Sequence, residues 1–305
     1  MENILHVGLD VGSTTVKIVV IDSNKKEIYS DYTRHFSDTK NTVCKVLESL
    51  PEKFPDSKFT IALTGSGAMS AATFLGLPFI QEVVACKRAV EKYIPKTDVV
   101  IELGGEDAKI IYFTNGIDQR MNGICAGGTG SFIDQMATLL QTDAMGLNEY
   151  AKNYKSIYPI AARCGVFAKT DIQPLINEGA TKEDLSASIF QAVVNQTISG
   201  LACGKPIRGN VAFLGGPLHF LSELRQAFIR TLSLGPDEII APDHSHLFAA
   251  VGSAMNYSED VCVPVEDIIA RLKGKIKLEF EVERMEPLFE NQFAYDEFTK
   301  RHSSH

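Results

Sequence analysis

The chain has 305 residues, 45% of them hydrophobic and 22% charged, a composition typical of a globular protein with room for two domains. Its 38 acidic and 30 basic residues give a formal charge of −8, which argues against a nucleic-acid partner. No stretch approaches the roughly 20 apolar residues of a membrane span and no signal-peptide pattern opens the chain, so the sequence predicts a cytoplasmic protein that does not bind membranes.

The first predicted element is a strand, a tight glycine turn and a second strand over residues 8–22. Asp10 closes the first strand, and the small residues of the turn allow backbone N–H groups to approach a ligand. Helical periodicity follows at residues 41–50. A short apolar strand that begins at Phe59 then leads through a glycine turn into a helix over residues 67–75.

Residues 100–114 repeat the opening strand, turn and strand without a gap. Glu102 takes the place of Asp10, and Lys109 takes the place of Lys17. A second strand and glycine turn at residues 210–217 corresponds to residues 59–67. The chain is therefore predicted to be a duplication of one α/β domain, in which antiparallel hairpins and later parallel strands form a mixed sheet.

Further helices are predicted at residues 131–140 and 182–203, and the small, apolar segment 246–255 predicts a helix that packs closely on a sheet. We expect a first domain at residues 1–95, completed by a C-terminal helix near 245–257, and a second domain at residues 96–244. Residues 258–305, with one weak strand pattern at 276–282, are expected to form a charged tail or linker.

Two such hairpins facing each other across a cleft are suited to gripping a polyphosphate through backbone amides and hydroxyls. Acidic residues beside the turns would hold hydrated Mg²⁺ and orient an attacking water. The predicted catalytic residues are Asp10, Glu102, Glu106 and Asp107. The predicted nucleotide-binding residues are Gly12, Ser13, Thr14, Thr15, Lys17, Gly104, Gly105, Gly127, Gly128, Thr129, Gly130, Asp134, Gly215, Gly216 and Pro217.

The stretches Asp10-Val-Gly-Ser-Thr14 and Leu103-Gly-Gly-Glu-Asp107, with the Gly215-Gly216 turn, resemble the phosphate and adenosine motifs of the actin, sugar kinase and heat-shock chaperone superfamily. The resemblance implies two RNase H-like domains with ATP or ADP and Mg²⁺ in the cleft. Asn122-Gly-Ile-Cys-Ala-Gly-Gly-Thr-Gly130 and Ala162-Arg-Cys-Gly-Val-Phe-Ala168 resemble a narrower group, the ATP-dependent activators of 2-hydroxyacyl-CoA dehydratases, which are related to the ATPase subunits of benzoyl-CoA reductase.

This narrower resemblance covers roughly residues 4–256 and implies a homodimer with one [4Fe-4S] cluster at its interface, bound by Cys125 and Cys164 of each subunit. Two thiolates from each chain would complete a four-thiolate cluster on a twofold axis. The resemblance also implies that ATP drives a low-potential electron to an iron–sulfur partner, with flavodoxin or ferredoxin as the donor. The helices behind the two cysteines would link the cluster to the nucleotide.

The chain departs from the activators at the second phosphate turn, where they carry D-x-G-G-Q-D and this chain has Glu102-Leu-Gly-Gly-Glu-Asp107. These changes resemble the activator modules of long fused proteins. They suggest an N-terminal piece of a larger protein, and the expected electron acceptor is then either an iron–sulfur dehydratase or a double-cubane-type reductase. Two alternatives stay open at this point: a kinase for a small hydroxy compound on the same fold, and a nucleotide-gated interaction module without a redox role.

Overall fold

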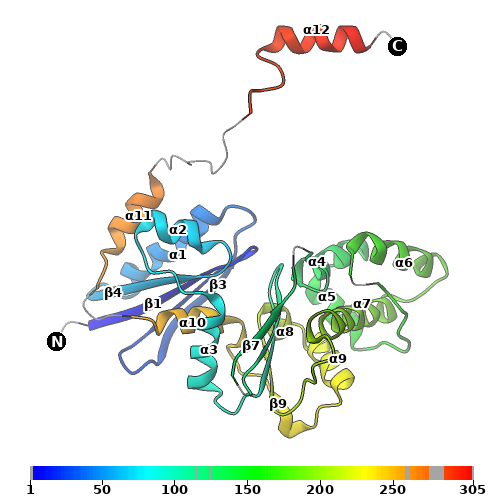
Figure 1. Cartoon of the computed structure of the whole chain (residues 1–305), viewed down its shortest axis with the longest axis horizontal. Coiled ribbons are helices and arrows are strands. Elements are labelled where there is room, and N and C mark those ends of the chain that lie inside the picture. The colour runs from blue at the N-terminus through cyan, green and yellow to red at the C-terminus, as the bar shows by residue number, and fades with distance from the viewer. Residues whose placement is uncertain are drawn as a thin grey trace.

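The structure is a computed structural model that describes residues 3–114, 116–123, 125–161, 163–257, 261–274 and 285–303. A four-stranded sheet in the order β3-β2-β1-β4 forms the centre of the first domain (Figure 1). Strand β1 pairs antiparallel with β2 and parallel with β4, and it is buried along nearly its whole length because helices cover both faces of the sheet. The elements are β1 (Asn3–Val11), β2 (Thr15–Ile21), β3 (Glu27–Arg34), α1 (Thr39–Lys53), β4 (Ser57–Thr64), α2 (Ala68–Leu75) and α3 (Glu82–Tyr93).

The second domain repeats this arrangement in a five-stranded sheet of order β7-β6-β5-β8-β9. Strand β5 pairs antiparallel with β6 and parallel with β8, as β1 does with β2 and β4. Its strands are β5 (Val99–Leu103), β6 (Ala108–Tyr112), β7 (Asp118–Met121), β8 (Val211–Leu214) and β9 (Ile239–Ile240). Its α-helices are α4 (Gly130–Leu139), α5 (Ala144–Ala151), α6 (Gly165–Asn177), α7 (Lys182–Thr197), α8 (Gly216–Phe220) and α9 (Ser222–Leu232).

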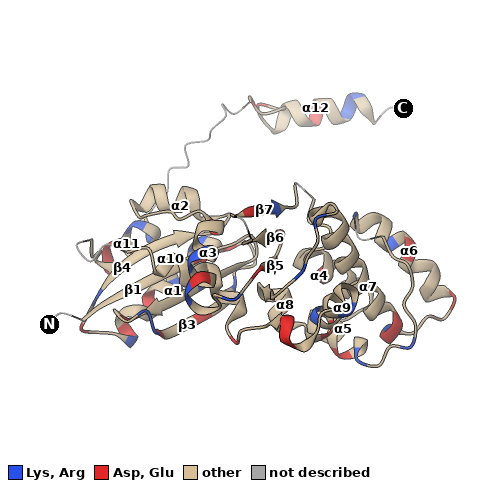
Figure 2. Cartoon of the chain, turned by 60° about the horizontal axis from the view of Figure 1, so that its bottom comes forward, with Lys and Arg blue, Asp and Glu red and all other residues tan. Residues whose placement is uncertain are grey.

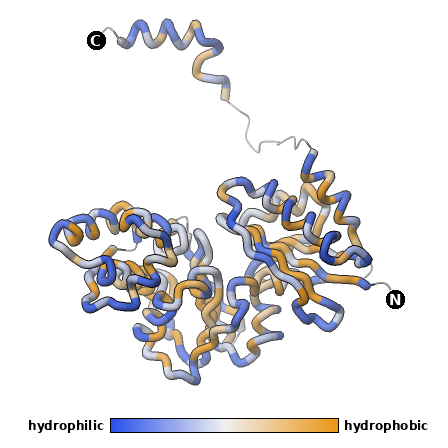
Figure 3. Tube along the Cα trace, turned by 180° about the vertical axis from the view of Figure 1, so that it is seen from behind, coloured by the Kyte–Doolittle hydropathy of each residue, from blue (hydrophilic) through white to orange (hydrophobic). Residues whose placement is uncertain are grey.

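The predicted fold class, a duplicated α/β fold with two mixed sheets, is confirmed by these pairings. The turns repeat in detail, because Gly12 N donates to the Thr15 carbonyl and Gly104 N donates to the Asp107 carbonyl, at 2.9 and 2.7 Å. Phe79 takes the place of β9 in the first sheet. It pairs in parallel with Leu63 of β4, as β9 pairs in parallel with β8. Hydrophobic segments gather in the strands of each domain, with hydrophilic segments on the outer turns (Figure 3).

The helix predicted over residues 182–203 is α7 followed by a π-helical turn, Ile198–Ala202. Two short 3-10 turns, Pro236–Glu238 and Ser245–Leu247, precede β9 and α10 (Phe248–Ala254), respectively. Acidic and basic residues are interspersed along the ribbon (Figure 2). None of the helices within the described ranges is both long and apolar enough to cross a membrane.

The C-terminal region contains α11 (Val265–Lys273) and α12 (Gln292–His302). Val265, Ile268 and Leu272 of α11 are buried in the first domain's core, since their spacing places them on one helical face. Part of the predicted tail is thus a packed helix. In α12 every described residue is at least partly exposed, and the strand pattern at 276–282 lies outside the described residues.

Helices α3 and α10 (Phe248–Ala254) lie between the two sheets and fill the space behind both hairpins (Figure 1). Their apolar residues share one buried cluster with Val19 of the first sheet and Val100 of the second. Glycine permits this fit at two points. A Cβ at Gly8 of β1 would overlap the Ala250 carbonyl oxygen, and a Cβ at Gly252 would overlap the Ala85 carbonyl oxygen of α3.

We expect Gly252→Ala to lower the free energy of unfolding by about 1–3 kcal/mol, because the added methyl group must push α10 away from α3. Urea denaturation of wild type and variant measures the difference. Gly235→Ala is the matched control, since a Cβ there would make only an ordinary contact of 3.4 Å with Glu238. Equal stability of Gly252→Ala and wild type would contradict the close-packing argument.

Candidate functional site

The two hairpin turns face each other and line one polar pocket between the domains. Ser13 and Thr14 meet Gly105 so closely that a Cβ at Gly105 would overlap the Thr14 hydroxyl. The predicted residues that line this phosphate pocket are Asp10, Gly12, Ser13, Thr14, Thr15, Lys17, Glu102, Gly104, Gly105, Asp107, Gly215 and Gly216. The fold therefore brings together most of the residues that the two repeated turns were predicted to contribute.

Each hairpin places a lysine directly opposite its acidic residue, since Asp10 pairs with Lys17 and Glu102 pairs with Lys109 in the strand registers. Lys17 Nζ donates to Asp10 Oδ2 at 2.7 Å. Burial disfavours the charged form of Lys17, but the Asp10 carboxylate outweighs it and raises the pKa of the ammonium group. Lys17 therefore keeps its charge and is held by Asp10.

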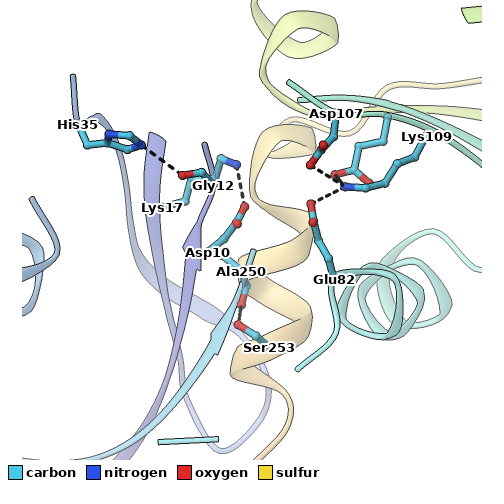
Figure 4. A network of polar contacts seen from close by, with 10 residues as sticks. Asp10, Gly12, Lys17, His35, Glu82, Asp107, Lys109, Ala250 and Ser253 are labelled. Carbon is cyan, nitrogen blue, oxygen red and sulfur yellow. Dashed lines mark hydrogen bonds and ion pairs between the residues drawn. The ribbon is translucent and has the colours of Figure 1, made fainter. Parts of the chain in front are cut away.

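Lys109 lies among three carboxylates. Its Nζ is 2.5 Å from Glu82 Oε1, 3.9 Å from Glu102 Oε1 and 4.0 Å from Asp107 Oδ2 (Figure 4). Burial opposes the charge of Lys109, but these carboxylates raise its pKa. Burial also raises the pKa of Glu82 to about 7, reinforced by the Glu102 and Asp10 carboxylates and opposed by Lys109.

The pocket suits a hydrated divalent cation. Four acidic residues line it: Asp10, Glu82, Glu102 and Asp107. Lys17 also lines the pocket, and Lys109 lies behind it against Glu82. When all six groups are ionised, their net charge is therefore −2. Glu102 Oε2 is buried and has no hydrogen-bond partner within the described ranges. An orphaned carboxylate oxygen is the type of group that accepts from Mg²⁺-bound water. Glu106, by contrast, is exposed and does not line the pocket.

A second cavity of about 340 Å³ adjoins the phosphate pocket at Gly216 and has the mixed apolar and polar lining expected for a nucleoside. Tyr32 and Phe220 form part of its wall. Arg34 of the first domain donates to Asp134 of the second at 2.9 Å, so one ion pair spans the cavity. The predicted nucleotide-binding residues in its lining are Gly130, Asp134, Gly216 and Pro217.

The predicted residues Gly127, Gly128 and Thr129 line neither cavity. They form the turn that leads into α4, and Thr129, at the N-cap position, is fully buried. The start of α4 is bonded to the second phosphate turn, because Gly130 N donates to the Gly104 carbonyl at 3.0 Å and Ser131 N donates to the Gly105 carbonyl at 2.7 Å. This turn therefore adjoins the phosphate site through the backbone.

The two motif cysteines lie on adjacent segments. Cys125 is exposed, with its Sγ 3.1 Å from the carbonyl oxygen of Arg163, and Cys164 is partly exposed at the N-cap of α6. Exposed apolar side chains follow, since Val166 and Phe167 are 73% and 66% exposed. Ile124 and Ala162 of the two motifs lie outside the described residues.

Asn122 joins the Cys125 turn to the second phosphate turn. Its side-chain amide donates to the carbonyls of Glu106 and Cys125 at 2.8 and 2.9 Å, and its Oδ1 accepts from Ala108 N at 2.8 Å. One side chain thus bonds to both turns.

The other cysteines differ in exposure. Cys44 and Cys86 are buried, Cys262 is partly exposed and Cys203 is exposed. Burial raises the pKa of the Cys44 and Cys86 thiols. Within the described residues of a single chain, no group of three or more His, Cys, Asp or Glu side chains is placed to hold a metal ion.

Several lining residues were not identified from the sequence. Glu82 at the start of α3, Ser66 after β4 and His246 before α10 all reach the phosphate pocket, and Tyr32 and Arg34 of β3 reach the nucleoside cavity. Ser66 lies in the glycine turn after β4, whereas the other four lie outside the glycine turns. Only contacts between elements distant in sequence identify those four.

The sequence profile of the BadF/BadG/BcrA/BcrD ATPase family matches residues 7–255. A 2-hydroxyisocaproyl-CoA dehydratase activator of Clostridioides difficile is 31% identical over 82% of this chain and 93% of its own length. The (R)-2-hydroxyglutaryl-CoA dehydratase activating ATPase of Acidaminococcus fermentans is 30% identical over 70% of this chain and 83% of its own. These matches confirm the resemblance to the activators.

Among solved structures, an activator of 2-hydroxyisocaproyl-CoA dehydratase from Clostridium difficile with bound ADPNP superposes with a TM-score of 0.72 at 27% identity. The alignment covers 93% of this chain and 100% of that one. The duplicated fold is therefore one that holds an ATP analogue in a similar protein.

The position of His246 at the phosphate pocket can be tested through the pH dependence of the protein's stability. Burial, aided by His219, His244 and Lys17, lowers its pKa to about 3, so the folded protein keeps the ring neutral. The unfolded chain takes up a proton near its ordinary pKa of about 6.5. The stabilisation is therefore complete above that pH and is lost as the pH falls from there towards 3.

We expect His246→Gln to reduce the fall in melting temperature between about pH 7.5 and about pH 5. Differential scanning fluorimetry at both pH values measures it, with the exposed His302→Gln as the control. A fall as large as that of wild type would contradict a neutral, partly buried His246.

Proposed function

Since this chain belongs to the BadF/BadG/BcrA/BcrD ATPase family, we propose that it uses ATP to transfer a low-potential electron to an iron–sulfur dehydratase or a double-cubane-type reductase. In this proposal a homodimer holds one [4Fe-4S] cluster between Cys125 and Cys164 of both subunits. Flavodoxin or ferredoxin would be the electron donor. The observation that carries the proposal is the direct linkage of the Cys125 turn to the second phosphate turn through Asn122.

For nucleotide binding, the phosphates of ATP would lie between the two hairpin turns and the nucleoside in the cavity bounded by Tyr32 and Phe220. Backbone amides and hydroxyls of Ser13 and Thr14 would donate to phosphate oxygens. Asp10, Glu102 and Asp107 would hold Mg²⁺ through its water ligands. The bound ATP analogue of the similar activator supports nucleotide binding by this fold.

During hydrolysis, water would attack the γ-phosphorus as its bond to the β-phosphate oxygen breaks, which gives ADP and inorganic phosphate. A pocket carboxylate would accept the proton that the water loses. Glu102 suits the role of orienting this water and accepting its proton, because its Oε2 is buried and has no hydrogen-bond partner among the described residues. The buried lysines would balance the carboxylate charge before the nucleotide arrives.

The cysteine segments fit the proposed cluster in number and exposure, because two accessible thiols from each chain leave four in a dimer. When bound, the cluster would supply one electron at low potential. The N-terminus of α6 directly after Cys164 would stabilise a thiolate through its free N–H groups. The exposed Val166 and Phe167 would be covered by the second subunit.

Purification without oxygen tests the proposal. We expect a brown dimer with about four irons, and a Cys125→Ser or Cys164→Ser variant that has lost most of its iron. Cys203→Ser is the matched control, because Cys203 is an exposed thiol outside both motifs. Full iron content in either motif variant, or a monomer that holds iron, would contradict the cluster assignment. Phosphate release from ATP without an added acceptor would argue against the kinase alternative.

The Asn122 linkage gives a separate prediction that needs no cluster. In iron-free protein, we expect alkylation of Cys125 by iodoacetamide to proceed at different rates with ADP and with ADPNP, because Asn122 couples the phosphate turn to the cysteine turn. Asn122→Ala should make the two rates equal. Site-resolved mass spectrometry measures them, with the exposed Asn153→Ala as the control. A difference that persists in Asn122→Ala would rule out this route.

A further inference from the structure

Lys109 joins the two domains inside the phosphate pocket. It belongs to β6 of the second domain and is 3% exposed, and its nearest carboxylate is that of Glu82 in the first turn of α3. In Figure 4 this ion pair and the Asp10–Lys17 pair lie on either side of the helix that carries Ala250 and Ser253. The Glu82–Lys109 contact is therefore a close polar contact between a buried lysine and a partly buried glutamate that are distant in sequence.

The internal repeat provides a comparison for this pair within one molecule. In the first hairpin Lys17 bonds to the acidic residue directly opposite, Asp10, at 2.7 Å. In the second hairpin Lys109 has the same register to Glu102, yet the two groups are 3.9 Å apart. Glu82 accounts for the difference, because it takes the Lys109 ammonium group at 2.5 Å.

This displacement leaves one carboxylate oxygen of the partly buried Glu102 unbonded among the described residues. Its Oε2 has no hydrogen-bond partner within the described part of the chain, and the residue lines the phosphate pocket. An unsatisfied buried acceptor is costly, so it is retained where a ligand completes it. Asp10, by comparison, already accepts from Lys17.

We propose that Glu82 is a positioning residue for ATP hydrolysis: it holds Lys109 away from Glu102 and thereby keeps the Glu102 carboxylate available for hydrated Mg²⁺ and the attacking water. The inference rests on the ATPase function proposed above. The two copies of the hairpin then differ in purpose. In the first copy the acidic residue is bonded to the lysine of its own hairpin. In the second copy a glutamate from α3 takes the lysine, and the acidic residue remains available.

Substitution of Glu82 tests this directly. In Glu82→Ala, Lys109 is expected to turn to Glu102, as Lys17 does to Asp10. We expect kcat for ATP hydrolysis to fall about tenfold or more, since loss of a group that orients another commonly costs about 10–100-fold, and KM for Mg-ATP to rise only by the factor by which Mg²⁺ tightens nucleotide binding in wild type. Glu82→Gln keeps an acceptor for Lys109, so its kcat should fall less than that of Glu82→Ala. Glu91→Ala on the exposed face of α3 is the matched control.

A binding measurement separates positioning from a loss of structure. Wild type should bind a fluorescent ADP analogue more tightly with MgCl₂ than with EDTA, and Glu82→Ala should lose this Mg²⁺ effect. In Glu82→Ala/Lys109→Met no ammonium group remains to occupy Glu102, so the Mg²⁺ effect and part of kcat should return. A purely structural defect would not be rescued by a second substitution.

The outcomes are distinguishable. Unchanged kcat and Mg²⁺ dependence in Glu82→Ala, or a double variant no better than the single one, would overturn the role of Glu82. Wild-type protein that binds the analogue with Mg²⁺ but hydrolyses no ATP would contradict the proposed function instead. In that case the binding comparison still decides whether Glu82 keeps Glu102 available.

Discussion

The close packing of α3 and α10 between the two sheets is the constraint on which the site depends. Gly8 and Gly252 allow backbone to lie against backbone there, and the apolar residues of both helices join the two domains in one buried cluster. Because β1 and β5 are thereby fixed relative to each other, their turns meet closely enough for Gly105 to contact Thr14. A phosphate pocket forms only when both turns are held in this way, since neither hairpin encloses a ligand by itself.

The duplicated turns have the same backbone geometry but different electrostatics. Both keep the glycine hydrogen bond and the cross-strand pairing of acid and lysine. Their surroundings then separate them, because α3 lies beside the second lysine and supplies Glu82. A buried ammonium group surrounded by carboxylates has a fixed charge, so its position decides which carboxylate remains free. Duplication thus provided two similar loops, and the helix between the domains made them unequal.

The second turn also adjoins the cysteine segment. Gly130 and Ser131 at the start of α4 donate to the turn's carbonyls, and Asn122 bonds to Glu106 and Cys125. Since these bonds are short and local, movement of the turn when a phosphate binds would displace the cysteine turn as well. This contiguity, together with membership of the ATPase family, is the structural basis of the proposed coupling between ATP and electron transfer.

The sequence by itself determined the duplication, the mixed sheets and most residues of the phosphate turns, because a hairpin, its glycine turn and its facing acid and lysine are set by neighbours in the chain. It also predicted the close helix before residue 255, from small residues alone. Only the tertiary structure decided that Glu82 lines the pocket, that Glu106 is exposed outside it and that α11 packs on the first domain. These outcomes depend on which elements meet in space, and residues that are neighbours in the chain do not determine that.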